Sequence, residues 1–148
     1  MGVAATHTLK NSGMRCVSTL MKLEMSSRPF ARTLELNGIM TKLYIAVLDE
    51  FPDYMTPTLV AHSVLNAHTK FQDNYDYLMW MKNSFKKCVV RVNRKEFDKI
   101  SVLPDVHLGH ENNTMNGEPA CAVVCPREDL PNVLKFAKLW SPITKGLT

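Results

Sequence analysis

Three polar residues in the stretch TPTLVAHSVLNAH, residues 56–68, have the types and the spacing for acid–base chemistry. Thr58, His62 and Asn66 follow one another at intervals of four, so a helix would align them along one face. Another face would hold the apolar side chains of Val60, Val64 and Ala67. An imidazole can accept a proton near neutral pH, and its polar neighbours can form hydrogen bonds, so the stripe is a candidate site for general-base chemistry.

The place of this stretch in the chain also favours a ligand site. It follows Leu43–Leu48, a continuous apolar run that is typical of a strand buried on both faces. Thr56 can cap a helix that has Pro57 at its first position and ends near His68. In open α/β sheets, ligands bind beyond the carboxyl ends of strands, where the N–H groups and dipole of the next helix favour anions.

The stripe therefore has two interpretations. In the functional one, Thr58 and His62 are catalytic residues, and Thr56 and Asn66 bind the substrate. In the structural one, Thr56 only caps the helix, Thr58 belongs to its first turn and His62 is a polar surface residue. The residues alone leave both interpretations open.

A second polar cluster, HLGHENNT, begins at His107 and leads from a short strand into a turn. Turn geometry explains an asparagine at Asn112, but it requires neither His110 nor Glu111. We predict Glu111 and Thr114 as catalytic residues, and His110 and Asn112 as substrate-binding residues. The order His-x-x-His-Glu differs from the His-Glu-x-x-His helix of metalloproteases, so we expect no metal site.

A basic run surrounds the segment KCVVRV, residues 87–92. Such runs are usually solvated faces, but Arg91 alternates with the apolar Val90 and Val92 and could flank an anion-binding cleft. We therefore include Arg91 among the substrate-binding candidates. The chain has no glycine-rich phosphate loop and no Gly-x-Ser-x-Gly elbow, so nucleotide hydrolysis and serine hydrolase chemistry have no support, and we expect no cofactor.

These candidates require a small α/β fold to position them. Hydrophobic periodicity predicts the order β-α-α-β-α-β-β-α, with Asn93 capping the helix RKEFDKIS, a tight reversal at Asn116–Gly117, and a final helix over EDLPNVLKFAKLW, residues 128–140. We predict a single domain over residues 42–148, with a four-stranded mixed β-sheet flanked by helices.

Residues 1–41 form a predicted N-terminal extension. They hold five basic and two acidic residues, whereas residues 42–148 hold thirteen and twelve. The extension can be an organellar presequence, a disordered or partner-binding segment, or an optional addition to a domain that starts after Met40. Because the domain itself is nearly neutral, nucleic-acid binding must be argued from a local site.

Composition limits the protein class and its compartment. Hydrophobic residues make up 45% of the chain and charged residues 22%, as in globular proteins, and no window approaches the 18 apolar residues of a membrane-spanning helix. The cysteines lack Cys-x-x-Cys spacing: Cys16, Cys88, Cys121 and Cys125. We therefore expect reduced thiols, no membrane partner and a cytoplasmic location.

Residues 42–140 resemble the type 2 peptidyl-tRNA hydrolase superfamily. The resemblance lies in KLYIAVLDEFPDYMTPTLVAHSVLNAH, YLMWMKNSFKKCVVRVNRKEFDKI and VHLGHENNTMNGEPACAVVCP. Asp49 and Met55 fit the family's loop between its first strand and helix. Gly117, the segment CAVVC and Pro126 keep the spacing of its last loop, strand and proline.

The resemblance implies a hydrolase with a small α/β fold that cleaves the ester bond of peptidyl- or aminoacyl-tRNA. His62 stands at the family's glutamine and would be the base, Glu111 would orient it, and Thr114 stands for the loop threonine. Thr58 occupies the position of the family's lysine, and with Thr114 or helix N–H groups it would bind the oxyanion.

Because that lysine is absent, a non-catalytic module of the same fold that recognises RNA or a protein partner is the alternative. A third possibility is an enzyme that acts on a small molecule. The sequence also allows a homodimer through a sheet edge or a helix face.

Overall fold

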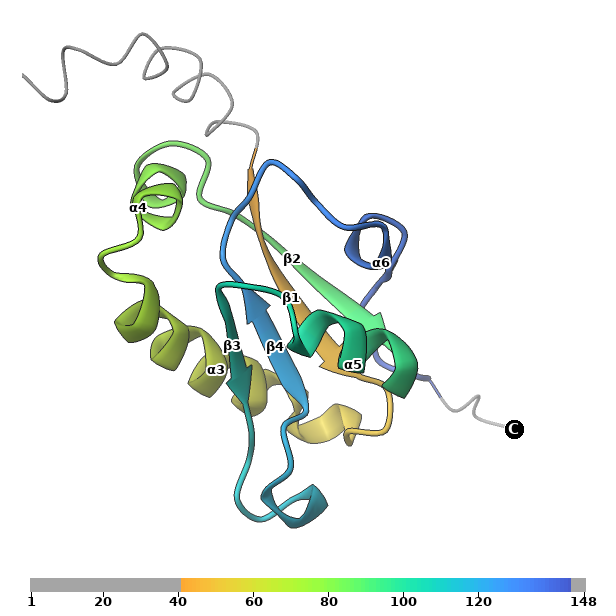
Figure 1. Ribbon diagram of the computed structural model, residues 1–148. Coiled ribbons are helices and arrows are strands. Elements are labelled where there is room, and N and C mark those ends of the chain that lie inside the picture. The colour runs from red at the N-terminus through yellow and green to blue at the C-terminus, as the bar shows by residue number, and fades with distance from the viewer. Residues whose placement is uncertain (1–40, 145–148) are drawn as a thin grey trace, which may run out of the picture. The chain divides into compact units, whose positions relative to one another are not determined.

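A five-stranded mixed sheet organises residues 41–144, which are the residues that the computed structural model describes (Figure 1). The strands are β1 (Lys42–Leu48), β2 (Lys86–Val92), β3 (Val106–Gly109), β4 (Cys121–Val124) and β5 (Lys138–Leu139). Their order is β3-β4-β1-β2-β5. β1 and β2 are parallel, β4 is antiparallel to β1 and β3, and β5 is antiparallel to β2. The expectations for residues 1–40 lie outside the described residues.

Helices cover both faces of this sheet. The α-helices are α3 (Thr56–Phe71), α4 (Tyr75–Lys82), α5 (Arg94–Ser101) and α6 (Asn132–Lys135), and short 3-10 turns are η1 (Asp53–Met55) and η2 (Met115–Gly117). Figure 1 shows α3 on one face of the sheet, with α5 and α6 on the other. Every residue of β4 is buried, because that strand lies between two others and beneath both helical layers.

The prediction of an α/β fold is confirmed, but the prediction of four strands is wrong. The segment expected to be one helix over residues 128–140 contains only the single turn of α6, followed by β5. Pro131 precedes α6 and disfavours helical backbone for the residue before it. The main chain then pairs with the open edge of β2, where Trp140 N donates to Val89 O at 2.9 Å. The apolar periodicity of so short a segment does not distinguish these alternatives.

The start of α3 also differs from the prediction. Met55, not Thr56, is the N-cap residue, and no side chain caps this helix. The cause is η1, which runs directly into α3, so that the Thr56 N–H already donates to Asp53 O. The Thr56 hydroxyl donates a hydrogen bond to Pro52 O at 3.2 Å instead. The helix continues to Phe71, one turn beyond the predicted end.

Two other local predictions are confirmed. Asn93 caps α5 and forms a capping box with Glu96, since each side chain accepts a hydrogen bond from the other residue's N–H. The hairpin between β3 and β4 reverses at Asn116 and Gly117, whose φ angles are 55° and 73°. Asparagine and glycine tolerate this left-handed backbone better than other residues.

Within residues 41–144, no helix combines the length and the apolar composition that crossing a membrane requires.

Candidate functional site

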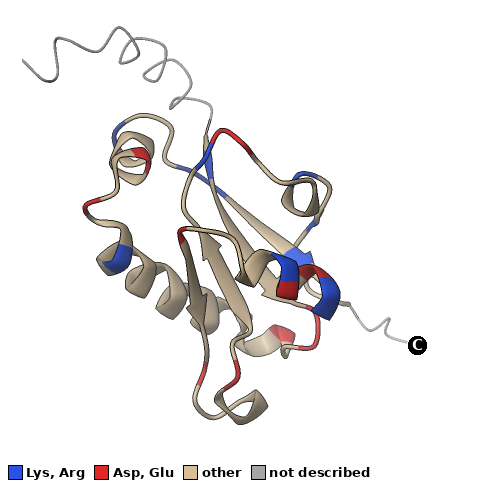
Figure 2. Cartoon of the chain, viewed as in Figure 1, with Lys and Arg blue, Asp and Glu red and all other residues tan. Residues whose placement is uncertain are grey.

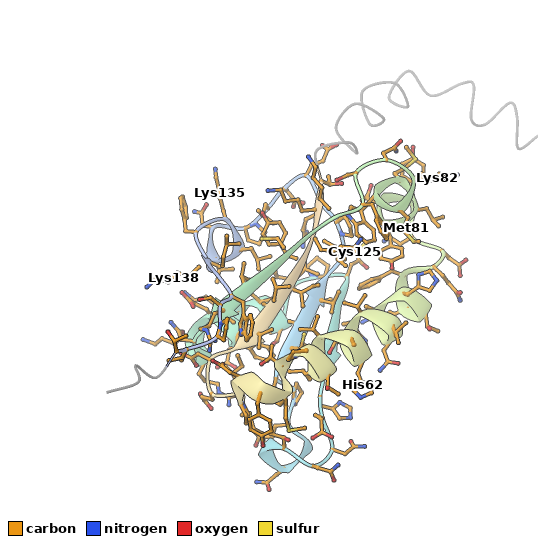
Figure 3. All side chains as sticks on the ribbon, turned by 180° about the vertical axis from the view of Figure 1, so that it is seen from behind. His62, Met81, Lys82, Cys125, Lys135 and Lys138 are labelled. Atoms are coloured by element: carbon orange, nitrogen blue, oxygen red, sulfur yellow. The ribbon has the colours of Figure 1, made fainter. Side chains whose placement is uncertain are left out.

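A polar pocket of about 250 Å³ lies between α3 and the segment that leaves β3. The helix contributes His62, Ser63 and Asn66, and the other wall is formed by residues 107–112. Figure 3 shows His62 on the side of α3 that faces the loop between β3 and β4. The pocket thus joins the two polar clusters that the sequence singled out, although they are far apart along the chain.

A close approach between α3 and β3 forms the floor of this pocket. Ser63 is fully buried, and its hydroxyl donates to Leu59 O at 2.7 Å. Gly109 lies directly against it, and a Cβ added to Gly109 would overlap the Ser63 side chain. With Ser63 packed on the strand, the exposed His62 and Asn66 lie on the adjoining part of the helix surface and line the pocket.

The loop itself holds the carboxylate of Glu111. Its Oε2 atom accepts hydrogen bonds from Asn113 N and Thr114 Oγ1, both at 2.9 Å, and its Oε1 accepts from Asn113 Nδ2 at 3.3 Å. The Thr114 hydroxyl also lies 3.3 Å from Met55 Sδ. The predicted catalytic pair is therefore arranged so that Thr114 orients Glu111. No hydrogen bond joins Glu111 to His62 or His110.

His107 is a pocket residue to which the sequence assigned no role. Strand alternation puts it on the same side of β3 as Gly109, facing α3. Its Nε2 atom is buried and has no hydrogen-bond partner within the described part of the chain. Burial, followed by the nearby Lys70 and His110, lowers the pKa of His107. The uncharged form of His107 is thus favoured, and its alternation with Val106 and Leu108 was the available sequence signal.

Five of the nine predicted site residues line the pocket: His62, Asn66, His110, Glu111 and Asn112. Thr114 contacts Glu111 without lining the pocket. Thr58 is exposed on α3 one turn before His62, and Thr56 is buried against η1; neither lines the pocket.

Arg91, the ninth predicted residue, forms a separate cluster. Its Nη2 atom donates to Asp53 Oδ1 at 2.9 Å and to Ser141 O at 2.7 Å. The other oxygen of Asp53 accepts from Ile143 N at 2.7 Å. That N–H group, and then Arg91, lower the pKa of Asp53. This cluster ties the loop before α3 to the segment after β5.

Two of the described cysteines, Cys121 and Cys125, are not poised for nucleophilic chemistry. Cys88, Cys121 and Cys125 are free thiols. Burial raises the pKa of Cys121 to about 11 and that of Cys125 to about 12, so both remain protonated at neutral pH. Among residues 41–144, no group of three or more His, Cys, Asp or Glu side chains is arranged to hold a metal ion.

The candidate site therefore consists of histidines, amides and one carboxylate, presented by α3 and by the end of β3. Such groups can accept a proton from water, stabilise an oxyanion by hydrogen bonds and hold a polar substrate. In comparisons with known proteins, no protein-family model matches the chain and no curated protein matches it.

Proposed function

We propose that this protein hydrolyses an ester bond of the kind that joins a peptide or an amino acid to tRNA. The observation that carries the proposal is the convergence of His62 from α3 with His110 and Glu111 from the hairpin loop on one polar pocket. The likeness of residues 42–140 to the type 2 peptidyl-tRNA hydrolase superfamily is the reason for choosing this ester.

In the proposed reaction, His62 accepts a proton from a water molecule as the water attacks the ester carbonyl. The amides of Asn66 and Asn112 donate hydrogen bonds to the oxyanion that develops. The imidazolium of His62 then returns its proton to the departing sugar oxygen. Glu111, held by Thr114 and Asn113, favours the imidazolium through its negative charge.

A non-catalytic module that recognises the end of an RNA is the second candidate, and a specific observation favours it. The carboxylate of Glu111 accepts its hydrogen bonds from Asn113 and Thr114 of its own loop and not from His62 or His110, so it does not hold either imidazole in a fixed orientation. Thr58, at the position of the family's lysine, does not line the pocket. Such a site would bind the ligand without activating water.

Turnover of an N-acetyl-aminoacyl-tRNA by the full chain separates these candidates. The test variant is His62→Ala, and the matched control is Thr58→Ala, which lies on the same face of α3 but outside the pocket. Loss of a general base should slow release of tRNA by about two orders of magnitude or more, whereas the control should keep its activity.

The other outcomes are equally informative. tRNA binding that weakens steeply with salt, without release of the acyl group, would establish the binding module. Activity that survives His62→Ala would remove His62 from the mechanism. A wild-type protein that neither releases nor binds the tRNA would refute both candidates.

A further inference from the structure

The outer side of β3 is an open sheet edge beside the pocket. β3 is a terminal strand, and within residues 41–144 its only strand neighbour is β4. Main-chain N–H and C=O groups on such an edge can pair with another extended chain. Because residues 107–109 also line the pocket, this edge is accessible to whatever the pocket binds.

The register determines which groups point outward. Cys125 N donates to Asp105 O at 2.9 Å, and Ala120 N donates to Gly109 O at 3.0 Å. Residues 105, 107 and 109 therefore direct their main-chain groups toward β4. Alternate residues, Val106 and Leu108, direct theirs away from the sheet.

Lys70 blocks one of these two outward positions. Its Nζ atom donates to Val106 O at 2.6 Å. Lys70 is the only Lys, Arg, Asp or Glu residue of α3 and lies near its carboxyl end, where the helix is blue in Figure 2. A lysine that covers the edge of a sheet is a known device against pairing with a second chain. The remaining outward position, Leu108, lines the pocket.

We propose that the outer edge of β3 at Leu108 binds a main-chain amide of the acyl part of the substrate, as a single added rung of the sheet. This subsite rests on the proposed hydrolase function and adds how its substrate is held. The Leu108 N–H donates to the carbonyl of that amide in the acyl chain.

The surrounding side chains suit an uncharged amide. Asn66 provides a carboxamide that lines the same pocket as Leu108. A carboxamide can hydrogen bond to a peptide group. Lys70 occupies the edge at Val106, two residues before Leu108, so the subsite binds one amide and not a long strand. Recognition through the main chain makes the site tolerant of different acyl side chains.

Binding of N-acetylpuromycin to the full chain tests this subsite without requiring turnover. This probe carries an acyl amide and joins its amino acid to the nucleoside by an amide that resists hydrolysis; puromycin, with a free amine, is the matched probe. In ¹⁵N-resolved NMR, hydrogen exchange at the Leu108 N–H should slow with N-acetylpuromycin and not with puromycin. Unchanged exchange at Leu108 while N-acetylpuromycin is bound would overturn the proposal.

Two substitutions distinguish the contribution of the Leu108 N–H group to binding from that of the Leu108 side chain. Leu108→Ala keeps the N–H, whereas Leu108→Pro removes it, and proline is tolerated where an edge N–H points outward. Leu108→Pro should bind N-acetylpuromycin about tenfold more weakly than Leu108→Ala. Equal affinities, with both variants folded, would refute the subsite. If Leu108→Pro does not fold, hydrogen exchange at the Leu108 N–H of the wild-type protein decides whether the subsite exists.

This experiment can fail independently of the proposed function. Release of tRNA from N-acetyl-aminoacyl-tRNA, without any binding of N-acetylpuromycin at Leu108, would retain the hydrolase and reject the subsite. Binding at Leu108 without release of tRNA would retain the subsite and reject the hydrolase.

Discussion

Gly109→Ala is the substitution whose consequence can be worked out most fully from the structure. A Cβ at this position would lie only 2.6 Å from the Ser63 Cβ and would overlap its hydroxyl. Non-bonded carbon atoms prefer about 3.5–4.0 Å, so α3 would have to move away from β3 by roughly 1 Å. Ser63 is fully buried, and its Cβ cannot rotate out of the way.

The expected cost is that of overpacking a core. Such substitutions destabilise a protein by about 1–3 kcal/mol. The same displacement would widen the contact that forms the floor of the pocket, so the proposed esterase activity should fall together with stability. Urea denaturation followed by circular dichroism would measure the change in the free energy of unfolding.

A double-mutant cycle with Ser63→Gly identifies the cause. Ser63→Gly alone should cost about 1 kcal/mol, because glycine is unfavourable inside a helix. It also removes the atoms that the new Cβ would meet, apart from the Ser63 Cα at 3.3 Å. The double variant should therefore be more stable than the sum of the two single effects predicts.

Gly117→Ala is the matched control. No atom lies within 4 Å of a Cβ at Gly117, but its φ of 73° makes alanine unfavourable there. Its cost should be independent of Ser63→Gly. Strict additivity of Gly109→Ala with Ser63→Gly would refute the inference that a steric clash with Ser63 is the reason for the glycine.

Three further predictions concern ionisable groups. The pKa of Asp53 is lowered, so its stabilising contribution should be present above its unfolded pKa and lost as the pH falls through the folded value; Asp53→Asn should make acid unfolding less steep. The pKa of His107 is lowered by burial, so its NMR titration midpoint should lie below 6.5, the value for an exposed histidine. Protonation of His107 should therefore destabilise the fold as the pH falls. Lys70→Ala frees a carbonyl of the β3 edge and should promote concentration-dependent dimerisation in sedimentation experiments, whereas Lys82→Ala, on the exposed end of α4, should not; a monomeric Lys70→Ala would contradict the blocking role of Lys70.

Local patterns were sufficient for much of the fold. The continuous apolar run at Leu43–Leu48 predicted the central strand because a strand covered on both faces has no polar side. Asn93 predicted the start of α5 because its side chain can cap a helix, and the structure adds that Glu96 completes a capping box with it. These predictions depend only on neighbours in the sequence.

The predictions that were wrong or missing concern features that depend on other parts of the chain. β5 exists because β2 offers an open edge to Leu139, a partner 49 positions away that no local pattern reveals. Thr56 had the right residue type for a cap, but the 3-10 turn before it already used its N–H. His107 escaped assignment because a histidine in a short strand gains its role only from the helix that covers it.

The position of the candidate site follows from the same non-local organisation. The sequence suggested a ligand beyond the carboxyl ends of parallel strands, and here the parallel pair is β1 and β2. Beside the end of β2, Arg91 binds Asp53, and Ile143 N closes the other side of that carboxylate. Meanwhile α3, which leaves β1, packs over β3, where Ser63 meets Gly109. The polar stripe of α3 is thereby carried to the outer edge of the sheet, and a pocket forms where side chains of the helix and the end of β3 face the same space.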